Sequence, residues 1–140
     1  MMKRLIAGFV MTIAFAAAAQ AGQSLLPGGV IVTDLGEGLT GVEGNMAAVR
    51  FTEDDVQQIG CRVAASPGVD ASVVCAAVDI DENVYFCFSS DPAMVATAQS
   101  ISPYSYISYA FDEFAQCTSL LISVRSHHIP DAAIEKAKTK

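Results

Sequence analysis

Four cysteines constrain the fold of this chain more than any other feature of its sequence. Cys61, Cys75, Cys87 and Cys117 each lie in a stretch where apolar and polar residues alternate, which is the pattern of β-strands. No CxxC pair occurs, so a zinc site is disfavoured and two disulfides are favoured. Such bonds persist mainly in oxidising compartments.

The first 21 residues have the three parts of an export signal. Lys3 and Arg4 precede an uncharged run, Leu5–Ala19, and the small-x-small motif Ala19-Gln20-Ala21 follows. The run is shorter than the roughly 20 apolar residues that cross a bilayer. We therefore expect a signal peptide over residues 1–21, no stable membrane anchoring after its cleavage, and a secreted or periplasmic protein.

The chain is acidic, and the imbalance is concentrated in its body. Fifteen Asp and Glu stand against eight Lys and Arg, a formal net charge of −7. Between residues 22 and 130 there are thirteen acids and three arginines, a net charge of −10. This charge disfavours binding to nucleic acid or to anionic membranes. It suits a cationic protein as a partner, although acidic charge also serves simply to keep an exported protein soluble.

Composition divides the rest of the chain into an arm, a core domain and a tail. Residues 22–48 are rich in glycine, and we expect an extended, loosely held N-terminal arm with one edge strand at Val30–Thr33. Residues 49–130 carry the patterns of a single α+β core domain, which the chain is long enough to stabilise. Residues 131–140 are expected to form a short C-terminal helix or tail.

Capping residues predict two helices in the core domain. Thr52 is followed by three acids, Glu53–Asp55, which suits a helix N-terminus and predicts a short helix ending near Gly60. Asp91-Pro92 places a capping side chain before a proline at the first helical position. An apolar stripe then follows at helical spacing.

Strands account for the remaining pattern. They predict an α+β fold built mainly on an antiparallel sheet of about four to five strands with two or three short helices, stabilised by disulfides. The expected strands of the core domain are Cys61–Ser66, Ser72–Ile80, Val84–Phe88, Tyr104–Asp112 and Cys117–Arg125.

The first predicted hairpin favours one disulfide pairing. The turn that begins at Pro67 sets a register in which Cys61 lies directly opposite Cys75, within the distance that a disulfide spans. Cys61–Cys75 is therefore the favoured bond, and Cys87–Cys117 is left over. Pairing of Cys75 with Cys87 remains an alternative, because both lie on one face of the next hairpin.

The second hairpin predicts a continuously apolar face. Closure at Asp81–Asn83 pairs Val78 with Phe86 and Ala76 with Phe88. In this register the cysteines lie on the opposite face, which is itself too apolar to be solvated. We expect that second face to be at least partly covered by the short helices or the arm.

The last hairpin is predicted to pair Ile107 with Ile122 and Tyr109 with Leu120. This register places apolar side chains opposite each other on one face. Cys117 is expected on the other face, together with the remaining three cysteines.

Motifs for catalysis or for a cofactor are lacking. Asp79–Asn83 has the acid spacing that opens an EF-hand loop, but Val84 replaces the required glycine, so a hairpin turn is predicted. His127 and His128 are adjacent and would point to opposite sides of an extended segment. We predict no catalytic residue, no metal site and no cofactor.

Tyr104, Tyr106 and Arg125 form the candidate binding surface. The predicted strand places both tyrosines on the face opposite Tyr109, beside Arg125. Such a pair can stack ligands, although tyrosine is also common in strands for its β propensity.

These features favour a small exported non-catalytic protein that binds a cationic protein as an inhibitor or accessory module. Two alternatives stay open: a small secreted hydrolase whose site is assembled from distant residues, and a subunit of an extracellular assembly that joins its neighbours through the glycine-rich arm. The sequence leaves the oligomeric state open.

Overall fold

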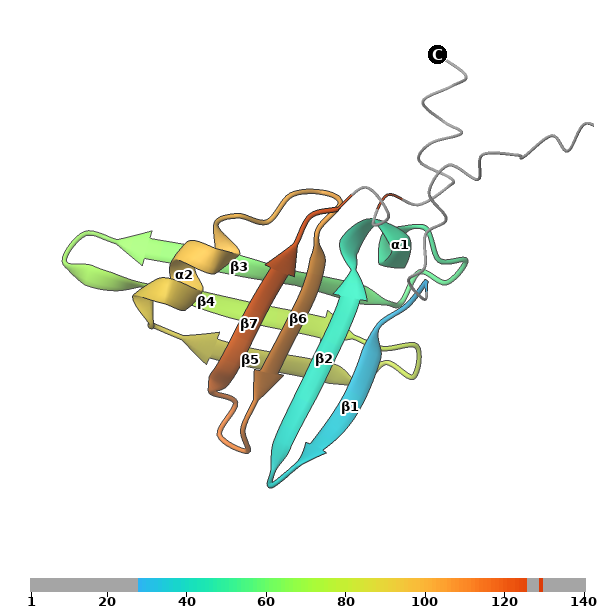
Figure 1. Ribbon diagram of the computed structural model, residues 1–140, viewed down its shortest axis with the longest axis horizontal. Helices are drawn as coiled ribbons and strands as arrows, with labels where there is room; N and C mark the ends of the chain where they lie inside the picture. Colours follow the sequence, from blue (N-terminus) through green and yellow to red (C-terminus); the bar gives the residue numbers. More distant parts are fainter. Residues whose placement is uncertain (1–27, 126–128, 130–140) are drawn as a thin grey trace, which may run out of the picture.

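The computed structural model of the protein describes residues 28–125 and residue 129. The predicted signal peptide, His127, His128 and the expected helix or tail over 131–140 lie outside the described residues. The described part folds into two antiparallel sheets and two short helices, and the two sheets form two layers whose strands cross (Figure 1).

The two sheets differ in size and in the part of the chain that builds them. The four-stranded sheet has the order β1-β2-β6-β7 and the three-stranded sheet the order β3-β4-β5. The four-stranded sheet contains β1 (Ile31–Gly36), β2 (Leu39–Asn45), β6 (Tyr106–Phe111) and β7 (Cys117–Ser123). The three-stranded sheet contains β3 (Gln58–Ser66), β4 (Val69–Val78) and β5 (Val84–Ser89). The helices are α1 (Met46–Arg50) and α2 (Pro92–Ala98).

The predicted class, an α+β fold stabilised by disulfides, is confirmed, but the residues described form two sheets and seven strands rather than one sheet of four to five. The strand that was not predicted, β2, lies in the glycine-rich segment. This segment forms a hairpin in which β1 lies at the sheet edge and β2 lies between β1 and β6.

Glycine serves close packing and turn geometry in this hairpin. Gly36 and Gly38 have φ of 79° and 75°, and between them Glu37 also has a positive φ of 54°, so a tight left-handed turn joins β1 to β2. At Gly41 a Cβ atom would lie 3.2 Å from the Leu35 Cδ1 atom, so the missing side chain leaves room for Leu35. The high glycine content therefore reflects a packed hairpin rather than a loose arm.

The helix expected after Thr52 does not form. The short helix α1 lies earlier in the chain, where the Asn45 side chain caps it by accepting a hydrogen bond from the Ala48 N–H at 2.8 Å. The Asp54 carboxylate instead accepts the backbone N–H groups of Val56 and Gln57, which holds a turn that leads into β3. The acids after Thr52 thus stabilise a loop.

The second predicted helix is confirmed as α2. Asp91 Oδ1 accepts the backbone N–H groups of Ala93 at 2.8 Å and Met94 at 3.1 Å, and Pro92 is the first helical residue. Val95 and Ala98 are buried, so the apolar stripe faces the core. α2 contacts β4 of one sheet and β7 of the other, beside the edge of the four-stranded sheet.

Two of the three predicted registers are confirmed over most of their length. Cys61 lies opposite Cys75, and the last hairpin pairs Ile107 with Ile122 and Tyr109 with Leu120. A bulge then shifts the last hairpin so that Phe111 pairs with Cys117.

The register of the second hairpin is shifted by two residues from the prediction. Ala76 pairs with Phe86, and Val78 with Val84. The turn closes earlier because the Asp79 carboxylate accepts the N–H groups of Asp81 and Asn83, and the Asp79 N–H donates to the Asn83 carbonyl. A shift of two residues leaves every side chain on its predicted face.

The face of the three-stranded sheet that carries the cysteines was predicted to be at least partly covered, and this is confirmed. Val73, Cys75, Ala77 and Cys87 are fully buried against the four-stranded sheet. The opposite, continuously apolar face, with Phe86, points away from that sheet. The core between the two sheets therefore includes the cysteines.

Candidate functional site

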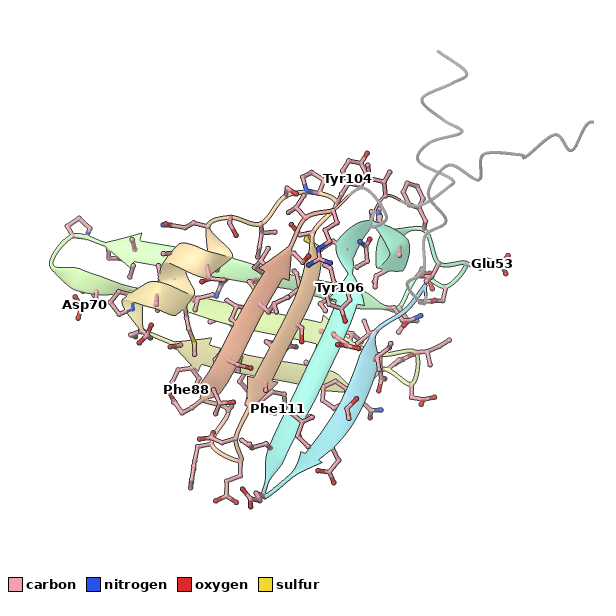
Figure 2. All side chains as sticks on the ribbon, viewed as in Figure 1. Glu53, Asp70, Phe88, Tyr104, Tyr106 and Phe111 are labelled. Atoms are coloured by element: carbon pink, nitrogen blue, oxygen red, sulfur yellow. A yellow bond between two sulfur atoms is a disulfide. The ribbon has the colours of Figure 1, made fainter. Side chains whose placement is uncertain are left out.

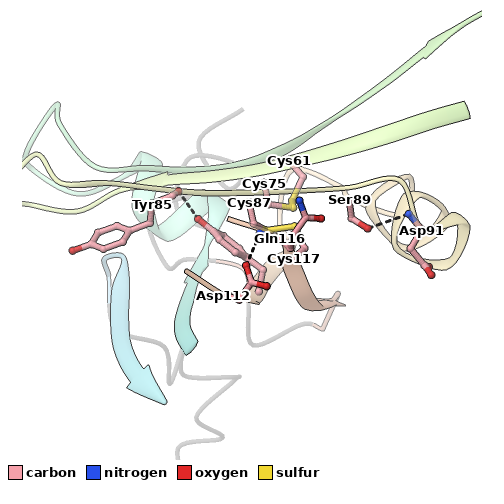
Figure 3. Close-up of a disulfide and its surroundings, with 10 residues drawn as sticks. Cys61, Cys75, Tyr85, Cys87, Ser89, Asp91, Asp112, Gln116 and Cys117 are labelled. Atoms are coloured by element: carbon pink, nitrogen blue, oxygen red, sulfur yellow. Dashed lines mark hydrogen bonds between the residues drawn. A yellow bond between two sulfur atoms is a disulfide. The ribbon is translucent and has the colours of Figure 1, made fainter. Parts of the chain in front are cut away.

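Both disulfides lie in the core region, but only one of them joins the two sheets. Cys61–Cys75 links the adjacent strands β3 and β4, and Cys87–Cys117 crosses from the three-stranded to the four-stranded sheet (Figure 3). These are the two pairs that the sequence favoured. Cys117 is itself buried, which corrects its expected position on the face away from Leu120, because the bulge in β7 turns it inward.

The tyrosine Tyr109 fixes the two sheets against each other. Its side chain is buried, and its hydroxyl donates a hydrogen bond of 2.8 Å to the Tyr85 carbonyl on β5. Burial raises the pKa of the Tyr109 hydroxyl. The face of the three-stranded sheet that carries the cysteines is thereby committed to structure, which leaves its other face for interaction.

That other face, here called the outer face, is apolar and exposed. Phe86 is 50% exposed, Phe88 43% and Val84 64%, large fractions for side chains of this kind. Polar side chains on this face are few. Its members on the three strands are Gln58, Gly60, Arg62, Ala64, Ser72, Val74, Ala76, Val78, Val84, Phe86 and Phe88.

The pairing of the strands arranges the outer face in three rows that cross the sheet. The middle row consists of Gly60, Ala76 and Phe86. Its side chains are therefore absent or small on β3 and β4, and large on β5. The two flanking rows carry larger side chains on β3 and β4. They consist of Gln58, Val78 and Val84 on one side and Arg62, Val74 and Phe88 on the other.

A groove follows from this arrangement. It has a volume of ≈ 490 Å³ and lies between β3 and β4, over Gly60 and Ala76 and between the pairs Gln58–Val78 and Arg62–Val74. A Cβ atom added at Gly60 would meet nothing within 4 Å, so the space above this residue is open. The Phe86 ring stands at the β5 end of the same row.

Exposed carboxylates lie at both ends of the outer face. Asp81 and Glu82 occupy the turn between β4 and β5, next to the Val78–Val84 pair. At the opposite end of the face, Asp70 lies near the tip of the β3–β4 hairpin, and Phe88 lies near the C-terminal end of β5 (Figure 2). The outer face thus combines an apolar centre with acidic ends and one cation, Arg62.

The loop between β6 and β7 extends the apolar surface at the edge of β5. The Phe88 N–H donates to the Ala115 carbonyl at 3.0 Å, which places this loop along the strand. Phe114 in the same loop is 72% exposed. The apolar surface therefore continues around the edge of the sheet.

The structure assigns different surroundings to the three residues of the predicted binding surface. Tyr104 lies in a turn before β6 and lines a hollow of ≈ 930 Å³ beside α1, whereas Tyr106 is the first residue of β6 (Figure 2). The Tyr106 hydroxyl is hydrogen-bonded to the Glu43 carboxylate, and burial together with Glu43 raises its pKa. Arg125 is exposed beyond the end of β7. A binding role for these residues stays a prediction.

The hollow beside α1 contains a carboxylate that the fold itself uses. Hydrogen bonds from the backbone and side-chain amides of Gln57 hold the pKa of Asp54 at about 2. Gln57 also accepts the Val30 N–H through its Oε1 atom at 2.8 Å, which ties β3 to the chain before β1. The polar groups in this part of the hollow thus hold the loop in place.

The outer face is a candidate functional surface that was not predicted from the sequence. The sequence did indicate this surface, because β4 and β5 are apolar on both faces, and only one of these faces is needed for the core.

Within residues 28–125 and residue 129, no three His, Cys, Asp or Glu side chains are grouped so as to hold a metal ion. No helix in the same part of the chain is long and apolar enough to span a bilayer.

Comparison with protein-family models, with curated proteins and with solved structures finds no match for this chain. The two disulfides indicate a non-cytoplasmic, oxidising compartment.

Proposed function

We propose that this protein is an exported, non-catalytic protein-binding module, secreted or periplasmic, whose binding surface is the outer face of the three-stranded sheet. The observation that carries the proposal is the exposure of Val84, Phe86 and Phe88 on a sheet whose opposite face already forms the core. A contiguous exposed apolar surface on a folded domain is typical of an interaction site. An inhibitor or accessory subunit would use such a surface.

Surface variants test this function directly. The wild-type protein and the double variant Phe86→Ser/Phe88→Ser are immobilised and exposed to the soluble fraction of the compartment to which the native cell exports the protein. We expect a bound protein that the wild type retains and the double variant loses. The matched control is Leu121→Ser, because Leu121 is also exposed, at 54%, but lies in the four-stranded sheet. If no retained protein depends on Phe86 and Phe88, the proposal is wrong.

A second function, assembly through the glycine-rich segment, is supported by the position of β1. This strand lies at the edge of the four-stranded sheet, and among the described residues it pairs with β2 alone. An edge strand can add to the sheet of a neighbouring molecule. Sedimentation velocity tests this role, since a protein that remains a monomer at all concentrations does not assemble in this way.

A further inference from the structure

We infer that the groove over Gly60 and Ala76 binds a cationic amphipathic helix of a partner protein. This inference rests on the proposed function and names the partner of the same surface. Its basis is an open groove lined mainly by uncharged residues, with exposed carboxylates at both ends of the same sheet face, in a domain whose body carries a net charge of −10.

The dimensions of the groove suit a helix laid across the strands. The flanking rows begin at Gln58 and Arg62, which are four residues apart on β3, a distance of about 13 Å at the rise of a β-strand. A helix with its side chains is about 10–12 Å in diameter. The spacing of the rows is close to the diameter of a helix, so one helix laid over the middle row would contact the side chains of both flanking rows.

The groove offers apolar contact on three sides. Ala76 forms its floor beside Gly60, and Val74 and Val78 line its two sides together with Gln58 and Arg62. Phe86, opposite Ala76 on β5, continues the same row beyond the groove. Apolar residues at i, i+3, i+4 and i+7 of a helix form one stripe that would meet these side chains. Burial of this stripe would provide most of the binding free energy.

The charge of the partner follows from the carboxylates around the groove. Asp81 and Glu82 are exposed at one end of the outer face and Asp70 is exposed at the other, whereas Arg62 is its one cation. Lysine or arginine on the flanks of the helix would lie in a negative potential. A second copy of this chain would bring the same carboxylates and the same net charge, so self-association is disfavoured.

The experiment uses two synthetic amphipathic helices that share one leucine pattern. One carries lysine on its polar face and the other carries glutamate. Binding to the full mature protein is measured by fluorescence anisotropy at low and high salt. We expect the lysine peptide to bind at least about tenfold more tightly than the glutamate peptide at low salt, and to lose much of this preference at high salt.

Filling the groove provides the decisive variant. Gly60→Val adds a side chain where a Cβ meets nothing within 4 Å, and valine is favourable in a strand, so the fold should be retained. We expect this variant to weaken lysine-peptide binding at least about tenfold. Gly28→Val is the matched control, because its Cβ position is also open and Gly28 lies outside the three-stranded sheet. Circular dichroism confirms that each variant is folded.

Three outcomes would overturn the inference: equal binding of the two peptides, unchanged binding by folded Gly60→Val, or a dimer in sedimentation that Gly60→Val dissociates. The first two leave the proposed function intact if Phe86→Ser/Phe88→Ser still loses its native partner. If the two peptides are discriminated as expected but Phe86→Ser/Phe88→Ser loses no partner, the proposed function is wrong, whereas the inference about the groove stands.

Discussion

Cys75 and Cys87 lie directly opposite each other on β4 and β5, yet each is bonded to a different cysteine. Cys75 is bonded to Cys61 on the far side of β4, and Cys87 reaches across the core to Cys117. Two disulfides thus meet side by side at one position of the sheet. One bond thus holds β3 to β4 within the smaller sheet, and the other holds β5 to β7 of the larger sheet at the same level of the strands.

Removal of Cys117 should therefore cause the remaining disulfide to rearrange. In Cys117→Ala the Cys87 thiolate is free beside the Cys61–Cys75 bond, and its attack on the Cys75 sulfur would form Cys75–Cys87 and release the Cys61 thiolate. We expect peptide mapping after alkylation to find the label increasingly on Cys61 as the pH is raised. The control is Cys87→Ala/Cys117→Ala, in which no attacking thiol remains. A label found on Cys87 alone would contradict the prediction.

The bond between the sheets should contribute more stability than the bond within one sheet. The chain-entropy model assigns about 3 kcal/mol to the Cys61–Cys75 loop and somewhat under 4 kcal/mol to the longer Cys87–Cys117 loop. We expect Cys87→Ala/Cys117→Ala to lower the free energy of unfolding in urea by more than Cys61→Ala/Cys75→Ala does. The reverse order would show that local packing around Cys61 outweighs loop length.

Acid should weaken the contribution of Asp54 to stability. Hydrogen bonds from Gln57 lower the Asp54 pKa to about 2 in the folded protein, from an ordinary value of 3.8. Because the folded-state pKa is depressed, this contribution is fully present above about pH 4 and is lost as the pH falls through 2. Asp54→Asn should thus be less stable than the wild type at pH 5, with a difference that shrinks by pH 2. Urea unfolding at both pH values measures this change.

The control for this prediction is the neighbouring exposed residue. Asp55→Asn makes the same chemical change one position along the loop, where no hydrogen bond to Gln57 is made through the substituted side chain. A pH-dependent stability difference of equal size in Asp55→Asn would assign the effect to general charge rather than to the Asp54 turn.

Sequence patterns sufficed for local features of this fold and failed where distant contacts decide. The turn at Pro67 determines the Cys61–Cys75 register, and Asp91 determines the start of α2, because each depends on residues close in sequence. The turn at Asp79 is the exception among the local features: it closes two residues early through hydrogen bonds of the Asp79 side chain to residues close in sequence, which alternation alone does not reveal.

The choice of buried face could not be predicted from alternation. Both faces of β4 are apolar, with Val73, Cys75 and Ala77 on one and Val74, Ala76 and Val78 on the other. Packing of the four-stranded sheet selects the first face, and the Tyr109 hydroxyl then bonds to β5 from more than twenty residues away. Because this long-range packing covers the first face, the second, outer face is the one left exposed.

Arg62 should weaken the binding of a cationic helix, since it is the cation of the outer face. Arg62→Gln removes one repulsive charge beside the groove and keeps a long polar side chain. We expect the lysine peptide to bind this variant about two- to fivefold more tightly at low salt, the effect of one exposed charge. The gain should largely vanish at high salt, because exposed charges are screened. Arg50→Gln removes another exposed arginine, on α1 and outside the three-stranded sheet, and therefore measures the effect of net charge alone. An equal gain in Arg50→Gln would mean that the peptide senses only the total charge of the domain. Weaker binding to Arg62→Gln would mean that Arg62 itself contacts the partner, and that the groove favours an anionic group at this end.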